Sequence, residues 1–457
     1  MIQAHTVAQV RAAEEPLLKA GVPLMARAST ALAVEVARRL PFVYGARVVL
    51  LVGSGNNGAD ALWAGAWLAR RGASVVAVLT ATPVQDALTA FLRAGGRVGT
   101  EDAVRGAEAV LDGLVGIGGH GPLRSPVPVL TGVPLVVAVD VPSGVEADTG
   151  FAHDGAVRAH VTVTFGTAKP GLLVARDHVG ELVVVDIGLD LQDAPVEALT
   201  DVAALLPGSD RVSDKYSRGV VGIAAGSSQY SGAALLCVGS AIRAGAGMVR
   251  YAGSAADRVR DHWPEAVVTD HLDDAGRVQA WVVGPGIGSD AYDTVAQVLA
   301  QDVPVLVDAD ALTICAAKPS LLLDREAPTL LTPHDREYER FGRPVGDDRI
   351  GAARRLAGDL GVHVLLKGDA TVVVGPSGLA RVNPTGSALL ATAGTGDVLA
   401  GAVGALLAQG LSPLDAGSVG AFLHGRAAAL STGGVTTSAG LVLEAWPAAV
   451  REALLRD

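Results

Sequence analysis

Residues 47–80 read RVVLLVGSGNNGADALWAGAWLARRGASVVAVLT, the pattern of a strand, a glycine turn, a helix and a second strand. The strand segments 48–52 and 75–79 are continuously apolar, which is typical of strands buried on both faces. A helix between two such strands indicates a parallel βαβ unit. Because parallel sheets bind ligands at the carboxyl ends of their strands, the glycine turn at 53–58 is a candidate binding loop.

The same pattern recurs in two halves of the chain. In the first half, apolar runs end in Gly, Asp, Ser or Lys at 107–114, 134–144, 160–166 and 181–189. Residues 23–40 add a helix that we expect to pack on the first sheet, and the strand pattern restarts at residue 219. The halves share no obvious repeat, and we place their boundary near residues 195–212. The sequence therefore predicts two different α/β domains, over residues 1–205 and 206–457, each with a mostly parallel sheet.

The composition argues against several classes of protein. The 457 residues carry a net charge of -11, whereas a surface that binds nucleic acid needs a basic excess. Two cysteines, Cys237 and Cys315, supply neither a disulfide framework nor a metal cluster. The N-terminus lacks the apolar core of a signal peptide, and the most apolar segment, 390–410, is interrupted by Asp397. We expect a soluble cytoplasmic protein without a membrane or nucleic-acid partner.

Polar side chains follow several strands of the first half. Asn57, Asp112 and Ser143 come after three neighbouring strands, so we expect their oxygen atoms to lie together. One carboxylate with neutral oxygens suits a monovalent cation better than Zn²⁺ or Mg²⁺. The alternative for the loop at Asn57 is an ordinary turn in which Asn and Asp cap a helix. Lys169 follows another strand among Gly and Pro residues, where it either meets an anion or is solvated.

These segments resemble the N-terminal domain of the bifunctional NAD(P)H-hydrate repair enzymes, the NAD(P)HX epimerase. That family carries GNNGGDG, D-x-x-x-G-x-G, V-D-I-P-S-G and F-G-x-x-K-P-G in this order, and the counterparts here are 55–61, 112–118, 139–144 and 165–171. Ala59 and Ala61 stand where the family has glycine. The methyl group of Ala59 would crowd a ligand if the loop needs a positive φ there.

The resemblance implies a Rossmann-like three-layer α/β/α fold and a K⁺ ion held by Asn57, Asp112 and Ser143. Asp140 is implied as a substrate contact and acid–base group, and we add Lys169 as a catalytic candidate. The implied substrate contacts are Asn56, Asn57, Gly58, Ala59, Asp60, Gly116, Ile117, Gly118, Gly119, His120, Gly121, Pro122 and Asp140.

The second half ends in a segment suited to phosphoryl transfer, NPTGSALLATAGTGDVLAG at 383–401. Gly394, Thr395 and Gly396 open a helix, where unpaired N–H groups and the helix dipole favour an anion. Asp397 lies where a base takes the proton of an attacking hydroxyl group. The alternative is an ordinary Asp in the first turn of a helix. Further candidate turns are SGA at 231–233, GPGIG at 284–288, TPH at 332–334 and LKGDAT at 366–371.

This half resembles the ribokinase-like superfamily, and most closely the C-terminal domain of the same repair enzymes, the NAD(P)HX dehydratase. The family motifs T-G-A, G-P-G-L-G, T-P-H-P-G-E, L-K-G-x-x-T and N-P-T-G…A-G-x-G-D-x-L-x-G have counterparts here, although Asp335 and Arg336 replace Pro-Gly. The resemblance implies that the hydrate contacts Ala233, Gly288, His334 and Asp397. It implies ADP contacts by Lys367, Gly368, Asp369, Ala370, Thr371, Gly394, Thr395 and Gly396.

The implied function is repair of NADHX and NADPHX, the hydrates of NADH and NADPH. The first domain would convert the R to the S epimer, and the second would dehydrate the S epimer with ADP and Mg²⁺, releasing AMP and phosphate. One alternative is a ribokinase-like small-molecule kinase whose product keeps its phosphate, although the attached first domain argues against it. Another is a nucleotide-binding protein with a degenerate epimerase domain. We also expect a homo-oligomer.

Overall fold

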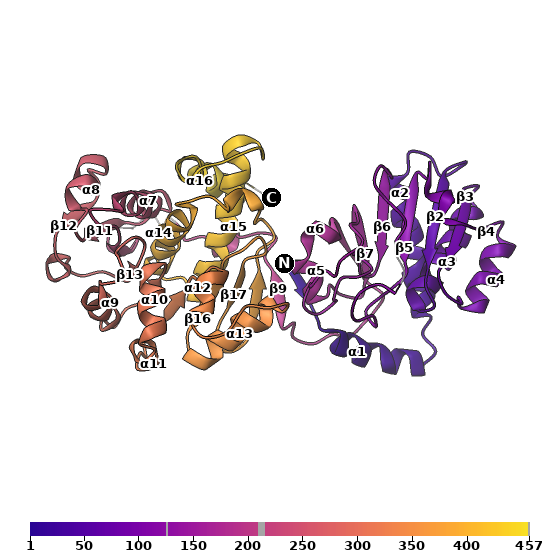
Figure 1. The fold of residues 1–457 in the computed structure, drawn as a ribbon, viewed down its shortest axis with the longest axis horizontal. Coiled ribbons are helices and arrows are strands. Elements are labelled where there is room, and N and C mark those ends of the chain that lie inside the picture. Colours follow the sequence, from indigo (N-terminus) through magenta and orange to yellow (C-terminus); the bar gives the residue numbers. More distant parts are fainter. Residues whose placement is uncertain (125–126, 209–214, 456–457) are drawn as a thin grey trace. The chain divides into compact units, whose positions relative to one another are not determined.

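The computed structural model describes residues 1–124, 127–208 and 215–455. The chain divides into two compact units, Gln3–Val196 and Glu197–Asp457, the latter joined by Met1 and Ile2 (Figure 1). The predicted division of the chain between residues 205 and 206 stays a prediction. Residues 209–212 of the predicted boundary region lie outside the described residues.

The first unit is built on a seven-stranded sheet in which neighbouring strands pair in parallel, as predicted. The strand order is β4-β3-β2-β5-β6-β7-β8. The strands are β2 (Arg47–Val52), β3 (Ser74–Leu79), β4 (Arg97–Gly99), β5 (Ala109–Gly113), β6 (Leu135–Val139), β7 (Val161–Phe165) and β8 (Glu181–Val185). The helices are α1 (Val7–Lys19), α2 (Leu24–Arg39), α3 (Asn56–Ala69), α4 (Gln85–Arg93), α5 (Pro170–Val174) and α6 (Arg176–Val179), with the 3-10 helix η1 (Glu101–Val104).

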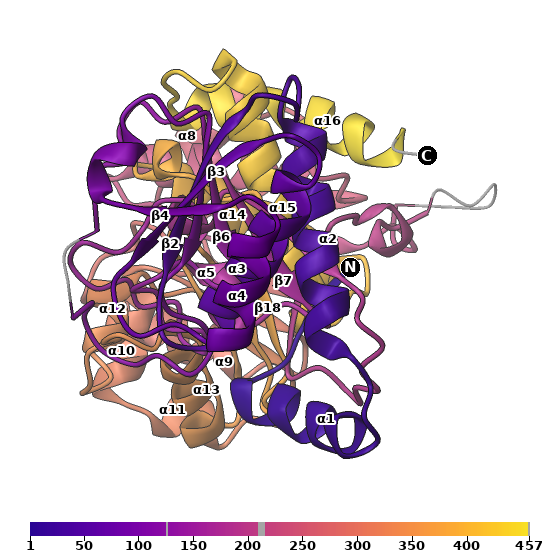
Figure 2. The ribbon, with the colours of Figure 1, turned by 90° about the vertical axis from the view of Figure 1, so that its right-hand side faces the viewer.

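Both faces of this sheet are buried, which explains the continuous apolar runs. Leu50 of β2 belongs to a core with α2, α3 and α4, whereas its neighbour Leu51 belongs to a second core with η1. Figure 2 shows α2, α3 and α4 on one side of the sheet. The helix predicted at 23–40 is α2, and its packing in this core confirms the prediction.

The second unit contains a sheet with the order β1-β9-β18-β17-β16-β15-β14-β13-β10-β11-β12. The strands from β12 to β16 are parallel, and β17 and β18 are antiparallel additions. The strands are β1 (Ile2–Ala4), β9 (Val196–Ala198), β10 (Val220–Ala224), β11 (Met248–Ala252), β12 (Val267–Thr269), β13 (Ala280–Val283), β14 (Val305–Val307), β15 (Thr329–Leu331), β16 (His363–Leu366), β17 (Val372–Val374) and β18 (Ala380–Val382).

The α-helices of this unit are α7 (Ser231–Arg243), α8 (Ala256–His262), α9 (Tyr292–Leu299), α10 (Asp310–Ala317), α11 (Ser320–Leu323), α12 (Asp335–Glu339), α13 (Arg349–Leu360), α14 (Thr395–Ala408), α15 (Pro413–Thr432) and α16 (Ala439–Leu454). Helix α14 is rich in small residues because it packs closely on α7. A Cβ at Gly401 would lie 2.1 Å from the carbonyl oxygen of Cys237 on α7.

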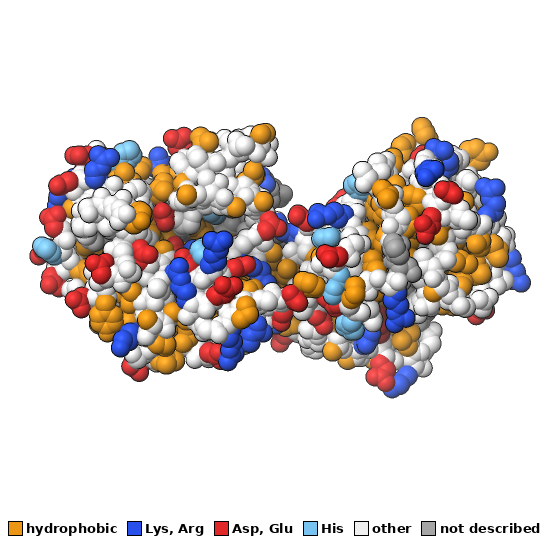
Figure 3. Space-filling model, in the orientation of Figure 1, with side chains coloured by type: hydrophobic (Ala, Val, Ile, Leu, Met, Phe, Trp, Pro, Cys, Tyr) orange, Lys and Arg blue, Asp and Glu red, His pale blue; other side chains and the backbone are white. Residues whose placement is uncertain are grey.

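Acidic and basic side chains are interspersed on the face shown in Figure 3. Among the described residues, no single helix is both long and apolar enough to cross a membrane, although α1 and α2 pass that test as a pair bent by 115°.

Two candidate active sites

The first candidate site is a cavity of about 560 Å³ beside the carboxyl ends of β2 and β5. The strand order reverses between these two strands, which is where open α/β sheets bind ligands. Of the residues predicted to contact substrate, the cavity wall contains Asn56, Asn57, Gly116, Ile117, Gly118, Gly119, His120, Gly121 and Pro122. The wall also contains Arg11 and Glu14 of α1 and Glu146, which the sequence analysis did not single out.

The predicted cation ligands Asn57, Asp112 and Ser143 do lie together. The Ser143 hydroxyl group donates to Asp112 Oδ1 at 2.6 Å, and the Ser143 N–H donates to Asp112 Oδ2 at 2.8 Å. The Asn57 amide nitrogen contacts the carbonyl oxygens of Val115 and Val139. Ser143 Oγ lies 3.4 Å from the Val115 carbonyl oxygen as well, so Asn57 and Ser143 share this oxygen and Asp112 joins them through Ser143.

The chemistry of these donors fits a monovalent cation. Asp112 is fully buried, and no Lys or Arg pairs with it in the described part of the chain. Burial raises the pKa of Asp112, against hydrogen bonds from Ser143 and Leu114 that lower it. A K⁺ ion would neutralise this carboxylate with neutral oxygen ligands around it, whereas a divalent ion would lack a second carboxylate here.

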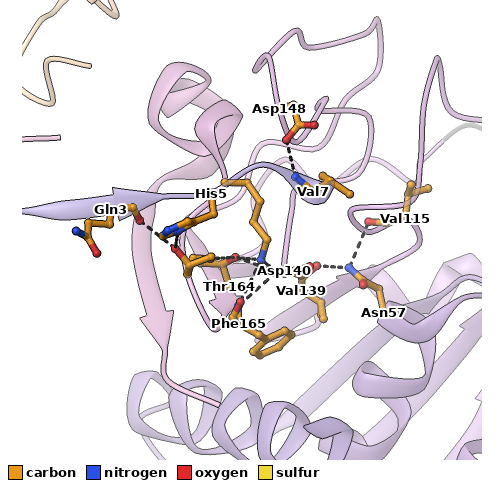
Figure 4. Close-up of polar contacts among 12 residues, drawn as sticks. Gln3, His5, Val7, Asn57, Val115, Val139, Asp140, Asp148, Thr164 and Phe165 are labelled. Atoms are coloured by element: carbon orange, nitrogen blue, oxygen red, sulfur yellow. Dashed lines mark hydrogen bonds and ion pairs between the residues drawn. The ribbon is translucent and has the colours of Figure 1, made fainter. Parts of the chain in front are cut away.

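Asp140 and Lys169, both predicted as catalytic, form a buried ion pair. Lys169 Nζ donates to Asp140 Oδ1 at 2.5 Å and to the hydroxyl oxygen of Thr164 at 2.9 Å. The Thr164 hydroxyl group donates in turn to Asp140 Oδ1 at 2.8 Å, as Figure 4 shows. Lys169 is 1% exposed, which excludes the solvated alternative. Asp140 has a φ of 67°, and strained non-glycine backbone of this kind clusters at functional sites.

Two further carboxyl groups share the electrostatic field of this pair. Asp60 is buried, and its Oδ1 has no hydrogen-bond partner among the described residues. Burial, and then the charges of Asp140 and Glu14, raise the pKa of Asp60 well above its ordinary value. Burial and the Asp140 charge also raise the pKa of Glu14. The site therefore combines the buried Asp140–Lys169 ion pair with two carboxyl groups whose pKa values are raised.

The residues of helix α3 that follow Asn57 do not line the cavity. Ala59 is fully buried in the core behind α3. Its φ is negative, since Asp140 and Ala309 are the non-glycine residues with a positive φ in the described ranges. The Ala59 methyl group would crowd a ligand only with a positive φ, so this condition is not met. Asp60 does not line the cavity, and its link to the site is its electrostatic interaction with Asp140.

Glu146 holds the glycine-rich loop 116–122, which lines the cavity. Its Oε1 accepts from the Gly121 N–H at 2.8 Å, and its Oε2 lies 3.1 Å from His120 Nδ1. His153 Nε2 lies 2.8 Å from Oε1, and hydrogen bonds from these groups lower the pKa of Glu146 against the opposing effect of burial. Glu146 thus ties the loop to the segment that follows Ser143.

The second candidate site lies at the start of α14 in the second unit. Gly394 has a φ of 85° and precedes the helix without a side-chain cap. The first N–H groups of a helix lack intrahelical acceptors, so this turn offers donors to an anion. A Cβ at Gly396 would lie 3.6 Å from Lys367 Nζ, which places the Lys367 ammonium group beside this turn.

Asp397, in the first turn of α14, has a raised pKa. Burial and then the charge of Asp308 raise its pKa to about 7, against the opposing effect of Lys367. Glu337 and Asp310 contribute in the same direction as Asp308. A carboxylate with a pKa near the working pH is well suited to general base catalysis.

Lys367, at the end of β16, is held by two carboxylates that the sequence analysis missed. Its Nζ donates to Asp308 Oδ1 at 2.7 Å and lies 3.6 Å from Glu337 Oε2. Glu337 also accepts from the His334 N–H at 2.8 Å and connects the predicted hydrate contact His334 to Lys367. Asp308 follows directly after an apolar strand, the one signal that could have identified it.

The other predicted contacts fall into two groups. Ala233 lies in α7, and a Cβ at Gly286 would come within 2.9 Å of its methyl group, beside the turn that contains Gly288. The segment 367–371 is a turn in which Thr371 Oγ1 donates to the Gly368 carbonyl oxygen at 2.9 Å. Asp335, which replaces the family Pro, pairs with Arg349 at 2.8 Å. The turn at 367–371 also contains the predicted ADP contacts Gly368, Asp369 and Ala370.

Comparisons with known proteins identify a family for each half of the chain. Residues 22–171 match the family described as YjeF-related protein N-terminus, and residues 221–443 match the family described as NAD(P)H-hydrate dehydratase. A ribokinase-like superfamily protein from Enterococcus faecalis V583 is 24% identical with a TM-score of 0.51, over 58% of this chain and 98% of that chain. This likeness shows a shared fold and confirms the predicted ribokinase-like fold of the second unit.

Two curated relatives match nearly the whole chain. The bifunctional NAD(P)H-hydrate repair enzyme of Mycobacterium leprae (strain TN) is 50% identical over 95% of this chain and 96% of its own length. The enzyme of the same name from Mycobacterium tuberculosis (strain ATCC 25618 / H37Rv) is 50% identical over 89% of both chains. This chain therefore belongs to the family of bifunctional NAD(P)H-hydrate repair enzymes.

Proposed function

We propose that this enzyme converts the R epimer of NADHX and NADPHX to the S epimer in its first unit and dehydrates the S epimer in its second unit. The observation that carries the proposal is Asp397, a carboxylate with a pKa of about 7 beside Lys367 and a glycine-capped helix start. A base, a cation and an anion-binding turn are the parts that phosphoryl transfer to a hydroxyl group requires.

The dehydration is proposed to proceed through a phosphate ester. The hydrate carries a hydroxyl group on C6 of the nicotinamide ring, and hydroxide is a poor leaving group. Asp397 takes the proton of that hydroxyl group while the hydroxyl oxygen attacks the β-phosphorus of ADP. The bond between the β-phosphorus and the oxygen of the leaving AMP breaks. The nitrogen lone pair of the ring then expels phosphate from C6, and loss of a proton from C5 restores NAD(P)H.

The phosphoryl donor is proposed to lie between Lys367 and the start of α14. Lys367 and the N–H groups at Gly396 face the charge that develops on the transferring phosphoryl group. No group of three or more His, Cys, Asp or Glu side chains in the described ranges could hold a metal ion. We therefore propose that Mg²⁺ enters with the nucleotide and is bound mainly by phosphate oxygens, as is common for this ion.

The epimerisation is proposed to use the buried groups around Asp140. The Asp140–Lys169 pair offers a carboxyl group held in place by a lysine, and Asp60 and Glu14 offer carboxyl groups whose pKa values are raised. Groups with pKa values pushed apart by their environment are the usual basis of acid–base assignments. A K⁺ ion held by Asn57, Asp112 and Ser143 would supply positive charge beside the loop 116–122.

The rate of dehydration is expected to depend on pH through Asp397. Because the base must be ionised, kcat/KM for the S hydrate should rise as the pH passes through about 7 and level off above it. Stopped assays of the full chain between pH 5.5 and 8.5, at saturating ADP, measure this acid limb. A profile that is flat across that range would contradict Asp397 as the base.

The epimerase is expected to depend on K⁺ through Asp112. The Asp112→Asn variant removes the carboxylate among the three proposed K⁺ ligands, so the K⁺ concentration for half-maximal epimerisation should rise by roughly tenfold or more. Thermal unfolding in KCl and in LiCl gives a second readout, because K⁺ should stabilise the natural protein and not the variant. Equal stabilisation of both proteins by K⁺ would contradict the assignment.

The overall proposal is tested with a mixture of both NADHX epimers, ADP and Mg²⁺, by following the absorbance of the reduced nicotinamide ring. Complete recovery is expected. Recovery of the S epimer alone would contradict the epimerase assignment, and no recovery would contradict the repair function.

A further inference from the structure

The three residues after β14 are Asp308, Ala309 and Asp310, and the backbone of Ala309 is strained. Ala309 has a φ of 50° and a ψ of -116°, and it directly precedes α10. Among the described residues, Asp140 of the first candidate site is the other non-glycine residue with a positive φ. Such backbone persists only where the surrounding structure imposes it, and it clusters at functional sites.

The two carboxylates on either side of Ala309 bind different partners. Asp308 Oδ1 accepts from Lys367 Nζ at 2.7 Å, and Asp308 is 2% exposed. Asp310 Oδ2 accepts from the Gly288 N–H at 2.9 Å. The sharp turn at Ala309 thus directs one carboxylate to the lysine after β16 and the other to the glycine turn after β13.

The triplet is also locked against the glycine turn by its backbone. The Asp308 N–H donates to the Val283 carbonyl oxygen at 3.0 Å. A Cβ at Gly284 would lie 1.9 Å from the Asp308 carbonyl oxygen, so only glycine permits this approach. The backbone of the triplet is fixed against the turn after β13, and its two carboxylates bind groups of the candidate site. This arrangement can hold those groups in position.

We propose that the Asp308–Ala309–Asp310 triplet positions the two substrates of the dehydration site separately, Asp308 through Lys367 for ADP and Asp310 through Gly288 for the hydrate. This inference rests on the proposed function of the second unit. It adds two positioning residues to the site and assigns each to one substrate.

The electrostatics give a readout that a purely structural role would not move. The charged groups that act on Asp397 are Asp308 on the β14 side, Glu337 on α12, Asp310 on α10 and Lys367 after β16. The thiol of Cys237, on α7, donates to the Asp397 carbonyl oxygen at 3.2 Å. Because Asp308 is the largest of the charges that raise the pKa of Asp397, Asp308→Asn should shift the acid limb of kcat/KM to lower pH.

The test compares Asp308→Asn, Asp310→Ala and a control, Asp347→Asn, in the full-length enzyme. Asp347 is exposed on the same unit. Asp308→Asn should raise the KM for ADP by roughly tenfold and leave the KM for the S hydrate within about twofold, and Asp310→Ala should do the reverse. The control should match the natural protein. Equal changes of both KM values in both variants, or no change in either, would overturn the proposal.

Folding and function are separated by two additional measurements. Asp308→Glu keeps the charge, so its kcat/KM should keep the acid limb of the natural protein. It replaces Asp308→Asn in the test if Asp308→Asn loses the native circular dichroism spectrum. Calorimetric titration with ADP does not require turnover, and it should show roughly tenfold weaker binding by Asp308→Asn. If the natural protein binds ADP but does not turn over the hydrate, the proposed function fails; if binding is unchanged in Asp308→Asn, the positioning role fails.

Discussion

The Asp397→Asn variant is expected to lose dehydratase activity by about 10²- to 10⁴-fold, the usual contribution of a general base. Asparagine keeps the shape of the side chain but cannot accept the proton of the attacking hydroxyl group. The loss should appear in kcat, since the N–H groups at the start of α14 and Lys367 are unchanged. ADP binding, measured by calorimetry, should stay within about threefold of the natural value.

The same variant is expected to be more stable than the natural protein at pH 8. The pKa of Asp397 is raised to about 7 in the folded state, so the folded protein keeps its proton at pH values where the unfolded chain has released it. Stability from this group is therefore present at low pH and is lost as the pH rises from about 4 to about 7.

Removing the charge at Asp397 should restore stability above that range, on the order of 1–4 kcal/mol at pH 8 and much less at pH 4. Urea unfolding at both pH values measures the difference. A variant that is inactive and also less stable at pH 8 would indicate that Asp397 has a structural role.

The second large effect is expected at Lys169. The Lys169→Met variant leaves the Asp140 carboxylate buried without its partner, which should lower the free energy of unfolding by about 3–5 kcal/mol and abolish epimerisation. Adding Asp140→Asn removes the unpaired charge, so the double variant should recover a large part of the stability but no epimerase activity.

The matched control is Lys19→Met on α1. Lys19 pairs with Glu15 at 2.6 Å, but both side chains are mostly exposed, so the loss should stay below about 1 kcal/mol. Thermal and urea unfolding of the three variants gives the comparison. If Lys169→Met costs no more than Lys19→Met, the buried pair does not have the energetic role that its geometry implies.

Much of the fold could be predicted because the local patterns agree with the final structure. The continuous apolar runs became buried parallel strands, and the small residues of 395–408 became a helix packed closely on α7. Gly394 was predicted to open this helix, and its φ of 85° is a conformation that glycine adopts at little cost. The roles of the individual site residues stay predictions.

The parts that could not be predicted depend on contacts between distant segments. Asp308 follows an apolar strand and Glu337 is an ordinary acidic residue in the sequence, but only the order of β14, β15 and β16 brings both to Lys367. Glu14 is one of two consecutive acids on an amphipathic helix, yet it lines the first cavity. The consequence of Ala59 depends on whether it is in a loop or a helix, and the structure places it inside α3.

The central claim is that phosphate is a transient leaving group, and the stoichiometry of a single reaction mixture tests it most directly. The full-length enzyme is incubated with the S epimer of NADHX, limiting ADP and Mg²⁺, and NADH, AMP and inorganic phosphate are quantified together. We expect the three products to form in equal amounts, each equal to the amount of ADP supplied. AMP accompanied by a stable phosphorylated nucleotide, with no NADH and no free phosphate, would identify a kinase and contradict the account.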